Sequence, residues 1–142
     1  MTIKLYSRKD FDHWTTISTN WGDMDGLRHI NHAAYLTYME TARLDLYKQI
    51  GHKLERWDQV DSSILASMTV NYIAQAAHPS TFDIGQRITR IGTKSYDIFT
   101  AIFEKNVAKP ILQANFILVS MNYKTGKTIL LPEEIKKCFN PF

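Results

Sequence analysis

The sequence predicts an α+β fold in which one antiparallel sheet of about five strands packs against a single long helix. The apolar residues change their spacing once, from the three- and four-residue steps of a helix to the alternation of strands. The alternating runs are separated by short turns, which pair strands antiparallel. The 142 residues fit one domain spanning residues 1–142, with no internal repeat or linker.

A first strand and the helix are expected in the N-terminal third of the chain. Residues 13–20, HWTTISTN, have the Thr, Trp and Ile content typical of a strand, and residues 22–31 lose all periodicity, which predicts a loop. From His32 the spacing is helical, with Asn31 suited to the N-cap and Gly51 to the end of the helix. The predicted apolar stripe of this helix consists of Tyr35, Tyr38, Met39, Ala42, Leu46 and Ile50.

Four further strands are predicted after the helix, and hairpins can join them. They cover residues 64–72, 82–91, 96–103 and 111–122, and a turn is expected at 124–127. Pro132 followed by two glutamates predicts the start of a short terminal helix, with Pro at its first position. Because residues 96–103 and 111–119 are apolar on both faces, we expect a second subunit to bury part of the sheet or an edge.

Composition and charge exclude several classes of protein. Apolar residues make up 44% and charged residues 22%, as in folded domains. The formal charge of +3 comes from scattered residues, so no nucleic-acid partner is expected. A mild positive field would suit an anionic small molecule, and it is equally explained by a surface charge that keeps the protein in solution. The single cysteine, Cys138, cannot form an internal disulfide and is expected to be inert. The N-terminus lacks an apolar signal segment and no run could span a bilayer, so we expect a cytoplasmic protein.

The loop before the helix carries the residues that could do chemistry. Asp23 and Asp25 can share one face of an extended segment, although capping or turn roles are common for Asp in loops. Arg28, His29 and His32 follow at the helix entrance, where unpaired N–H groups can stabilise an acyl oxyanion. A nearby carboxylate can attack the carbonyl or take a proton from water, and a histidine can polarise it or transfer a proton. This set suffices for a thioester, whose sulfur leaves readily.

The same side chains could in principle bind a metal. Asp23, Asp25, His29 and His32 are all possible ligands. However, no HExxH or CxxC spacing is present, and neither is a GxSxG elbow, a P-loop or a GxGxxG motif. We therefore expect neither a metal nor a cofactor.

The segment WGDMDGLRHINHAAYLTYMETAR resembles the signature of hotdog-fold thioesterases of the 4-hydroxybenzoyl-CoA thioesterase type. In that family D-x-D-x-x-G-H-[VIL]-N-N-x-x-Y leads into a long central helix that begins Y-[LF]-x-x-[FM]-E-x-A-R. Weaker similarities in NYIAQAAHP, IGTKSYDI and LLPEEIKK extend the resemblance over nearly the whole chain. The matching residues of the first block are Asp23, Asp25, His29, Ile30, Asn31, Tyr35, Glu40 and Arg43.

The resemblance implies a hotdog fold, with the sheet wrapped around the helix, and roles for the loop residues. Asp25 would be the catalytic carboxylate, as nucleophile or general base. His32 stands where some members use a catalytic histidine and others a backbone N–H that polarises the thioester carbonyl. His29, Asn31 and Tyr35 would shape the substrate site.

Two further positions follow from the resemblance. Lys94 and Ser95 stand where the family often contacts the CoA portion of its substrate. Glu40 stands close to the catalytic carboxylate of another hotdog branch and is a reserve candidate. An ion pair with Arg43, one turn further along the helix, is its simpler interpretation.

Two residues depart from the family pattern. Arg28 replaces the usual glycine, which argues against the usual loop conformation, because glycine tolerates positive φ and arginine does so poorly. Its guanidinium could instead reach an anionic group. Gln75 stands where proline is common, which leaves the detail of that strand end open.

The resulting hypothesis is an acyl-CoA thioesterase, built as a homodimer or homotetramer with its site at the subunit interface. The alternatives are a hotdog protein that binds acyl-CoA or acyl carrier protein without hydrolysis, and a hotdog dehydratase or hydratase. The D-x-D loop before the helix favours the thioesterase over the dehydratase. Acyl-chain length and the choice between CoA and carrier protein stay open.

Overall fold

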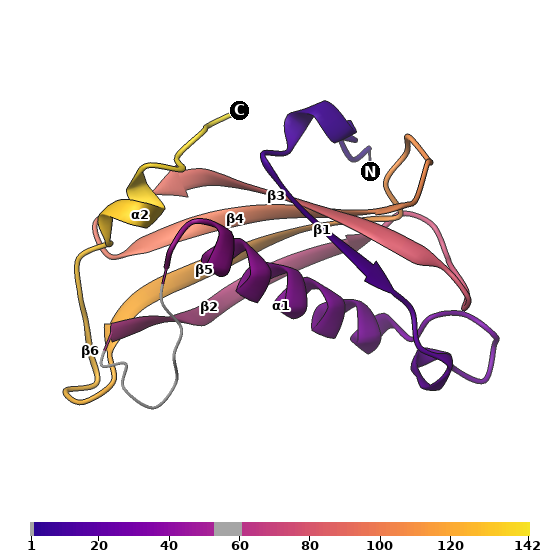
Figure 1. Cartoon of the computed structure of the whole chain (residues 1–142), viewed down its shortest axis with the longest axis horizontal. Helices are drawn as coiled ribbons and strands as arrows, with labels where there is room; N and C mark the ends of the chain where they lie inside the picture. Colours follow the sequence, from indigo (N-terminus) through magenta and orange to yellow (C-terminus); the bar gives the residue numbers. More distant parts are fainter. Residues whose placement is uncertain (1, 53–60) are drawn as a thin grey trace.

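The computed structural model describes residues 2–52 and 61–142 and shows a curved sheet around one long helix (Figure 1). Its first strand and helix are β1 (His13–Ser18) and α1 (His32–Gln49), with short 3-10 turns at Arg8–Asp10 and Trp21–Asp23. The later elements are β2 (Asp61–Tyr72), β3 (Thr81–Ile91), β4 (Ser95–Glu104), β5 (Leu112–Asn122), β6 (Lys127–Thr128) and α2 (Glu133–Lys136).

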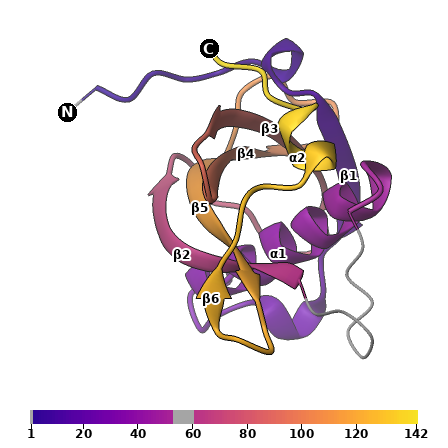
Figure 2. The ribbon, with the colours of Figure 1, turned by 90° about the vertical axis from the view of Figure 1, so that its left-hand side faces the viewer.

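The sheet has the order β1-β3-β4-β5-β2, and β6 is added to one end of β5. All described pairs are antiparallel, and the sheet curls around α1 (Figure 2). This arrangement confirms the predicted α+β hotdog fold. One part of the predicted connectivity was wrong: β2 pairs with β5 and not with β3. The connecting residues 73–80 are too many for a tight hairpin, and they carry the chain past the start of α1 instead.

Both ends of α1 follow from local sequence. The Asn31 side chain accepts a hydrogen bond from the Ala33 N–H at 2.8 Å, as an N-cap does. At the other end Gly51 has φ of +77°, and the His52 N–H donates to the Tyr47 carbonyl at 2.8 Å. This is the Schellman ending, in which glycine adopts the left-handed conformation that other residues disfavour. The predicted bounds of the helix are confirmed.

Strand β4 is apolar on both faces because each face packs into a different cluster. On β4, Ile98 and Ile102 belong to the main core against α1, and the alternation of a strand turns Phe99, Ala101 and Phe103 to the outer face. A second, smaller apolar cluster forms on that outer face. The apolar residues on the two faces therefore belong to two separate cores of the same chain.

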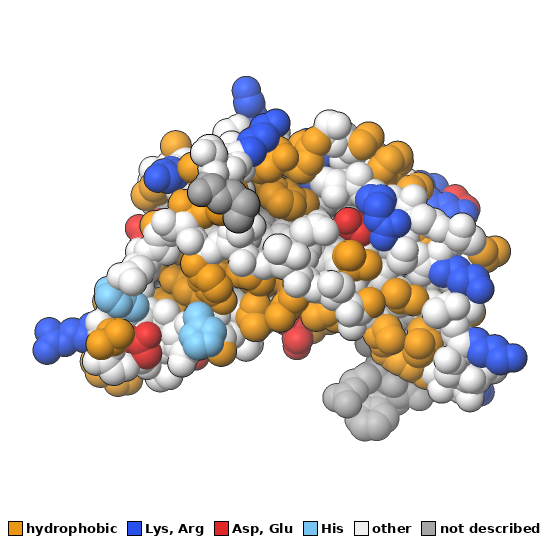
Figure 3. Space-filling view, turned by 180° about the vertical axis from the view of Figure 1, so that it is seen from behind, with side chains coloured by type: hydrophobic (Ala, Val, Ile, Leu, Met, Phe, Trp, Pro, Cys, Tyr) orange, Lys and Arg blue, Asp and Glu red, His pale blue; other side chains and the backbone are white. Residues whose placement is uncertain are grey.

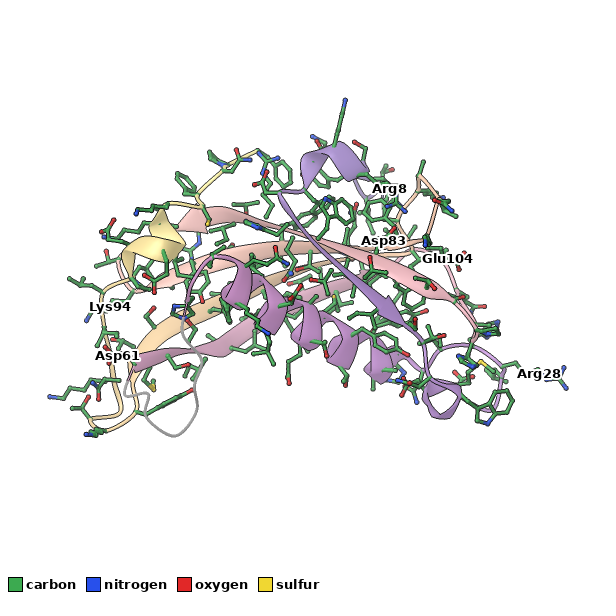
Figure 4. The ribbon with its side chains drawn as sticks, in the orientation of Figure 1. Arg8, Arg28, Asp61, Asp83, Lys94 and Glu104 are labelled. Carbon is green, nitrogen blue, oxygen red and sulfur yellow. The ribbon has the colours of Figure 1, made fainter. Side chains whose placement is uncertain are left out.

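The N-terminal segment and the C-terminal tail cover this outer cluster. Phe11 is buried against it, and the ring of Phe142 stacks on Tyr6 with centroids 4.3 Å apart. Arg8 fixes the segment, since its guanidinium pairs with Asp83 at 2.9 Å (Figure 4). On this face the chain itself provides the burial that was expected from a second subunit. The oligomer stays a prediction.

The C-terminal helix α2 begins at Glu133, with Pro132 as its N-cap, one residue earlier than the position predicted for the proline. Cys138 follows it and is half-buried, and burial raises the pKa of its thiol. A raised pKa keeps the sulfur protonated and weakly nucleophilic. Within residues 2–52 and 61–142, no helix is long and apolar enough to cross a membrane. The cytoplasmic location stays a prediction.

Candidate functional site

The loop between β1 and α1 holds Asp25 in a defined position. One carboxylate oxygen, Oδ1, accepts the backbone N–H groups of Leu27 at 2.8 Å and His29 at 3.3 Å. The backbone closes the same turn, because the Asp25 N–H donates to the His29 carbonyl at 2.8 Å. In the described part of the chain Oδ2 accepts no hydrogen bond, and the side chain is exposed. Asp25 is therefore anchored by one oxygen and has the other available.

Arg28 lies at the tip of this loop and has φ of +65°. The residue thus adopts the left-handed conformation that glycine favours, and the expectation that arginine would avoid it was wrong. Its backbone N–H is held by the Asp25 carbonyl at 3.2 Å, which explains how the turn is kept. The side chain extends into solvent at one end of the molecule (Figure 4).

Asp23 has a different environment from Asp25. Its carboxylate accepts the Tyr38 hydroxyl at 2.6 Å and the Asn20 amide at 3.2 Å, and its carbonyl accepts the Asn31 N–H at 2.8 Å. Burial, helped by the hydrogen bond to Asp23, raises the pKa of Tyr38 to about 12. Asp23 therefore ties the loop to α1. In the part of the chain that the structure describes, no three His, Cys, Asp or Glu side chains gather as possible metal ligands.

The first turn of α1 has one backbone N–H group without a partner in the described residues. The Ala33 N–H is used by the Asn31 side chain and the Ala34 N–H by the Asn31 carbonyl, but the His32 N–H donates to no group in residues 2–52 or 61–142. The Tyr72 hydroxyl, from β2, donates to the His32 carbonyl at 2.9 Å and holds this turn in place. An exposed N–H at the positive end of a helix is suited to an anionic oxygen.

These groups meet at a cavity of about 220 Å³. Asp25, His29, His32 and Tyr35 all line it, so the structure brings together four of the predicted site residues. Burial raises the pKa of Tyr35 to about 12, which keeps its hydroxyl protonated. Figure 3 shows histidine side chains and apolar surface gathered at this end of the molecule. The remaining lining residues are Leu27, Ile30, Tyr72, Ala74 and Gln75.

Two of the predicted residues, Lys94 and Ser95, lie elsewhere. Lys94 is exposed in the turn between β3 and β4, at the end of the molecule opposite Arg28 (Figure 4). Ser95, beside it, accepts a hydrogen bond from Arg90 at 2.9 Å. The chain by itself therefore places neither of them at the Asp25 cavity. Asn31, in contrast, is adjacent to the cavity but uses its side chain as the helix cap.

Glu40 is exposed on α1 and does not line the cavity. The predicted ion pair with Arg43 was wrong: in the described residues the Arg43 guanidinium lies over the Phe116 ring, 5.1 Å from its centroid, and forms no bond with Glu40. Packing against an aromatic face replaces the i,i+3 pair.

Tyr38 and Tyr72 are the contributors that the sequence did not reveal. Tyr38 was assigned to the apolar stripe of the helix, where it is buried, and Tyr72 to an alternating strand, which it ends. Their hydroxyls act on Asp23 and His32. The only available signal was the residue type, since a buried tyrosine hydroxyl usually finds a partner.

Comparisons with known proteins agree with this architecture. The model of the thioesterase-like superfamily matches residues 19–139. The PA5185 protein of Pseudomonas aeruginosa strain PAO1 has a similar structure, with a TM-score of 0.88, 23% identity, and coverage of 96% of this chain and 94% of that one. A DHNA-CoA thioesterase from Staphylococcus aureus gives a TM-score of 0.77 at 22% identity, covering 84% and 80%. At these identities the likeness establishes the fold. No curated protein matches the chain.

Proposed function

We propose that this chain, which belongs to the thioesterase-like superfamily, hydrolyses the thioester bond of an acyl-CoA to a free acid and a thiol. The observation that carries the proposal is the placement of Asp25. Its anchored carboxylate lines the same small cavity as His32, whose backbone N–H is unpaired in the described residues. A nucleophile or base beside an oxyanion donor is what acyl transfer requires.

In the proposed mechanism the thioester carbonyl oxygen accepts the His32 N–H at the start of α1, where the helix dipole stabilises the negative charge of the transition state. The free oxygen of Asp25 then attacks the carbonyl carbon, the C–S bond breaks, and the thiolate leaves with a proton from solvent. Water hydrolyses the resulting mixed anhydride. In the alternative route, Asp25 takes a proton from a water molecule that attacks directly.

The supporting residues position these groups. Tyr72 holds the His32 carbonyl and thereby the first turn of α1. The Tyr38–Asp23 hydrogen bond ties the loop to the helix. We propose that His29 and Tyr35, which line the cavity, contact the acyl group or the thioester.

We further propose that a second copy pairs antiparallel with the edge strand β2. The cavity is small for a ligand site, and it lies at the Tyr72 end of β2. Lys94 lies near the other end of this strand, since its carbonyl accepts the Ser120 N–H and Ser120 pairs with Ser63. Antiparallel pairing puts opposite ends of the two β2 strands together. Lys94 and Ser95 of the second copy would then approach the cavity, where they could bind the CoA portion.

Release of free thiol from a panel of acyl-CoAs tests the activity. Asp25→Asn keeps the size of the side chain and its place in the turn but removes the charge, so thiol release should fall by roughly 10²–10⁴-fold. Glu40→Gln is the matched control and should retain activity. The opposite pattern would move the reaction to Glu40. No turnover by the wild type would favour binding without hydrolysis, and hydration of crotonyl-CoA would favour a hydratase.

A single turnover in H₂¹⁸O, with enzyme in excess, tests for attack by Asp25. If water attacks the Asp25 carbonyl carbon of the mixed anhydride, the label enters the carboxylate of the enzyme and the product acid carries the former Asp25 oxygen. Direct attack of water puts the label in the product acid alone, as does attack at the acyl carbon of the anhydride, so label in the enzyme identifies the Asp25 route. Assays with the same acyl group on CoA and on acyl carrier protein decide which thiol carrier is preferred.

A further inference from the structure

A second cavity lies at the other end of α1, between the C-terminus of that helix, β5 and α2. It has a volume of about 410 Å³, and its wall includes His52, Ser62, Ser120 and Glu134. α1 has 18 residues, so the two cavities are separated by roughly 27 Å of helix at 1.5 Å per residue. A small molecule bound in one cavity of a protomer cannot touch the other.

His52 lies in the wall of this cavity and has one ring nitrogen without a partner in the described residues. Its side chain is 7% exposed, and Nδ1 lies 3.0 Å from Glu134 Oε1. Because an ionised carboxylate can only accept, Nδ1 carries a proton, and in the neutral imidazole Nε2 then carries a lone pair. Burial opposes ionisation of Glu134 most strongly, but the hydrogen bond from His52, a backbone hydrogen bond and nearby positive charge together outweigh it and lower the pKa of the carboxyl. In the described residues Nε2 is buried and has no hydrogen-bond partner.

Ser120 adds a second buried group without a partner. It is 2% exposed, and its hydroxyl forms no hydrogen bond within residues 2–52 and 61–142. Nearby hydroxyls behave differently: Tyr47 and Tyr96 are hydrogen-bonded at 2.6 Å, and Tyr96 donates to Ser63 at 2.6 Å. Buried polar atoms are nearly always paired. Two unpaired ones in the wall of one cavity therefore point to an occupant.

We propose that this cavity binds a small neutral molecule through a hydroxyl group that donates to His52 Nε2 and accepts from the Ser120 hydroxyl. A hydroxyl is the simplest group that does both. The carboxylates of Asp61 and Glu134 in the wall disfavour an anion, while Leu130 and Pro132 offer apolar surface to a carbon skeleton. The site is independent of the proposed thioesterase reaction, because no residue of the Asp25 cavity takes part in it.

Probes with one carbon skeleton and different head groups test this proposal. Benzyl alcohol, toluene, benzylamine and benzoate are titrated into the ¹⁵N-labelled protein, and binding is followed by shifts of the backbone amides of Gly51 and Ser120. Benzyl alcohol should bind more tightly than toluene by at least about fivefold, the value of one hydrogen bond of roughly 1 kcal/mol. Benzoate should not bind.

Two substitutions locate the site. Ser120→Ala should weaken benzyl alcohol binding by about the same factor without weakening the fold, since the hydroxyl it removes has no partner. Thr100→Val is the matched control, because Thr100 is also a buried hydroxyl without a partner in the described residues but does not line the cavity. It should bind benzyl alcohol like the wild type. His52→Gln provides a second loss of affinity at the other polar group.

Several results would overturn the proposal. Equal binding of toluene and benzyl alcohol would show an apolar cavity, and tighter binding of benzylamine or benzoate would show a charged one. Unchanged affinity in Ser120→Ala would place the alcohol elsewhere. Absence of binding by every probe would mean that water alone occupies the cavity.

Discussion

Replacement of Arg28 by glycine is expected to stabilise the protein, because Arg28 has φ of +65°. The left-handed conformation costs a residue with a side chain roughly 1–2 kcal/mol. Glycine avoids this cost but loses roughly 0.5–1 kcal/mol more conformational entropy on folding. The difference leaves a gain of about 0.5–1 kcal/mol for Arg28→Gly. The exposed arginine side chain makes no hydrogen bond in the described residues, so little else changes.

Arg28→Ala is the control that isolates the backbone term. Alanine removes the same guanidinium but keeps the strained conformation. The free energy of unfolding, measured by urea titration, should therefore be about 0.5–1 kcal/mol higher for Arg28→Gly than for Arg28→Ala. Equal stability of the two variants would refute the reasoning. In the thiol-release assay, a rise in KM with unchanged kcat in both Arg28→Gly and Arg28→Ala would show that the guanidinium binds an anionic part of the substrate.

Three further outcomes are expected. A Cβ at Gly85 would lie 2.8 Å from Phe11 Cβ, so Gly85→Ala should cost about 1–3 kcal/mol of unfolding free energy in urea, whereas Gly22→Ala, with open space around it, should cost far less. Tyr38→Phe removes the 2.6 Å bond to Asp23 and should lower stability by roughly 1–2 kcal/mol and also slow thiol release. The pKa of Tyr38 is about 12 when folded against an ordinary 10.0, so its contribution is complete below pH 10.0 and is lost as the pH rises through about 12. Unfolding measured across this range should show a decline that is smaller in Tyr38→Phe, and an equal decline would contradict the assignment.

The elements that were predicted well depend on local chemistry. Asn31 and Gly51 determine the ends of α1 through groups within a few residues, and alternation determines which face of each strand is buried. The partner of β2 could not be predicted in the same way. Alternation gives the faces of a strand but not its neighbours, and β2 pairs with β5, which lies far along the chain.

For the candidate site, the sequence likewise indicated the segment but not the contacts within it. Asp23 and Asp25 are the same residue type two positions apart, and nothing local distinguishes them. They differ because Tyr38, 15 residues from Asp23, turns back from α1 to bind that carboxylate and leaves Asp25 with a free oxygen. The resemblance directed attention to the loop, and the catalytic roles that it implies for Asp25 and His32 stay predictions. It did not supply the three-dimensional contacts, and for Arg28 a rule about side chains and positive φ gave the wrong expectation.

The outer cluster of the sheet also narrows where a second subunit can bind. Phe99, Ala101 and Phe103 are already covered by the N-terminal segment, so their apolar character no longer requires a partner. The edge strand β2 has only one neighbour in the described sheet, β5, and exposes Leu65 and Met68. An open, apolar strand edge is stabilised by pairing. Because Tyr72, at the end of this same strand, lines the Asp25 cavity, one contact would complete both the sheet and the proposed substrate site, and assembly and activity would then depend on each other.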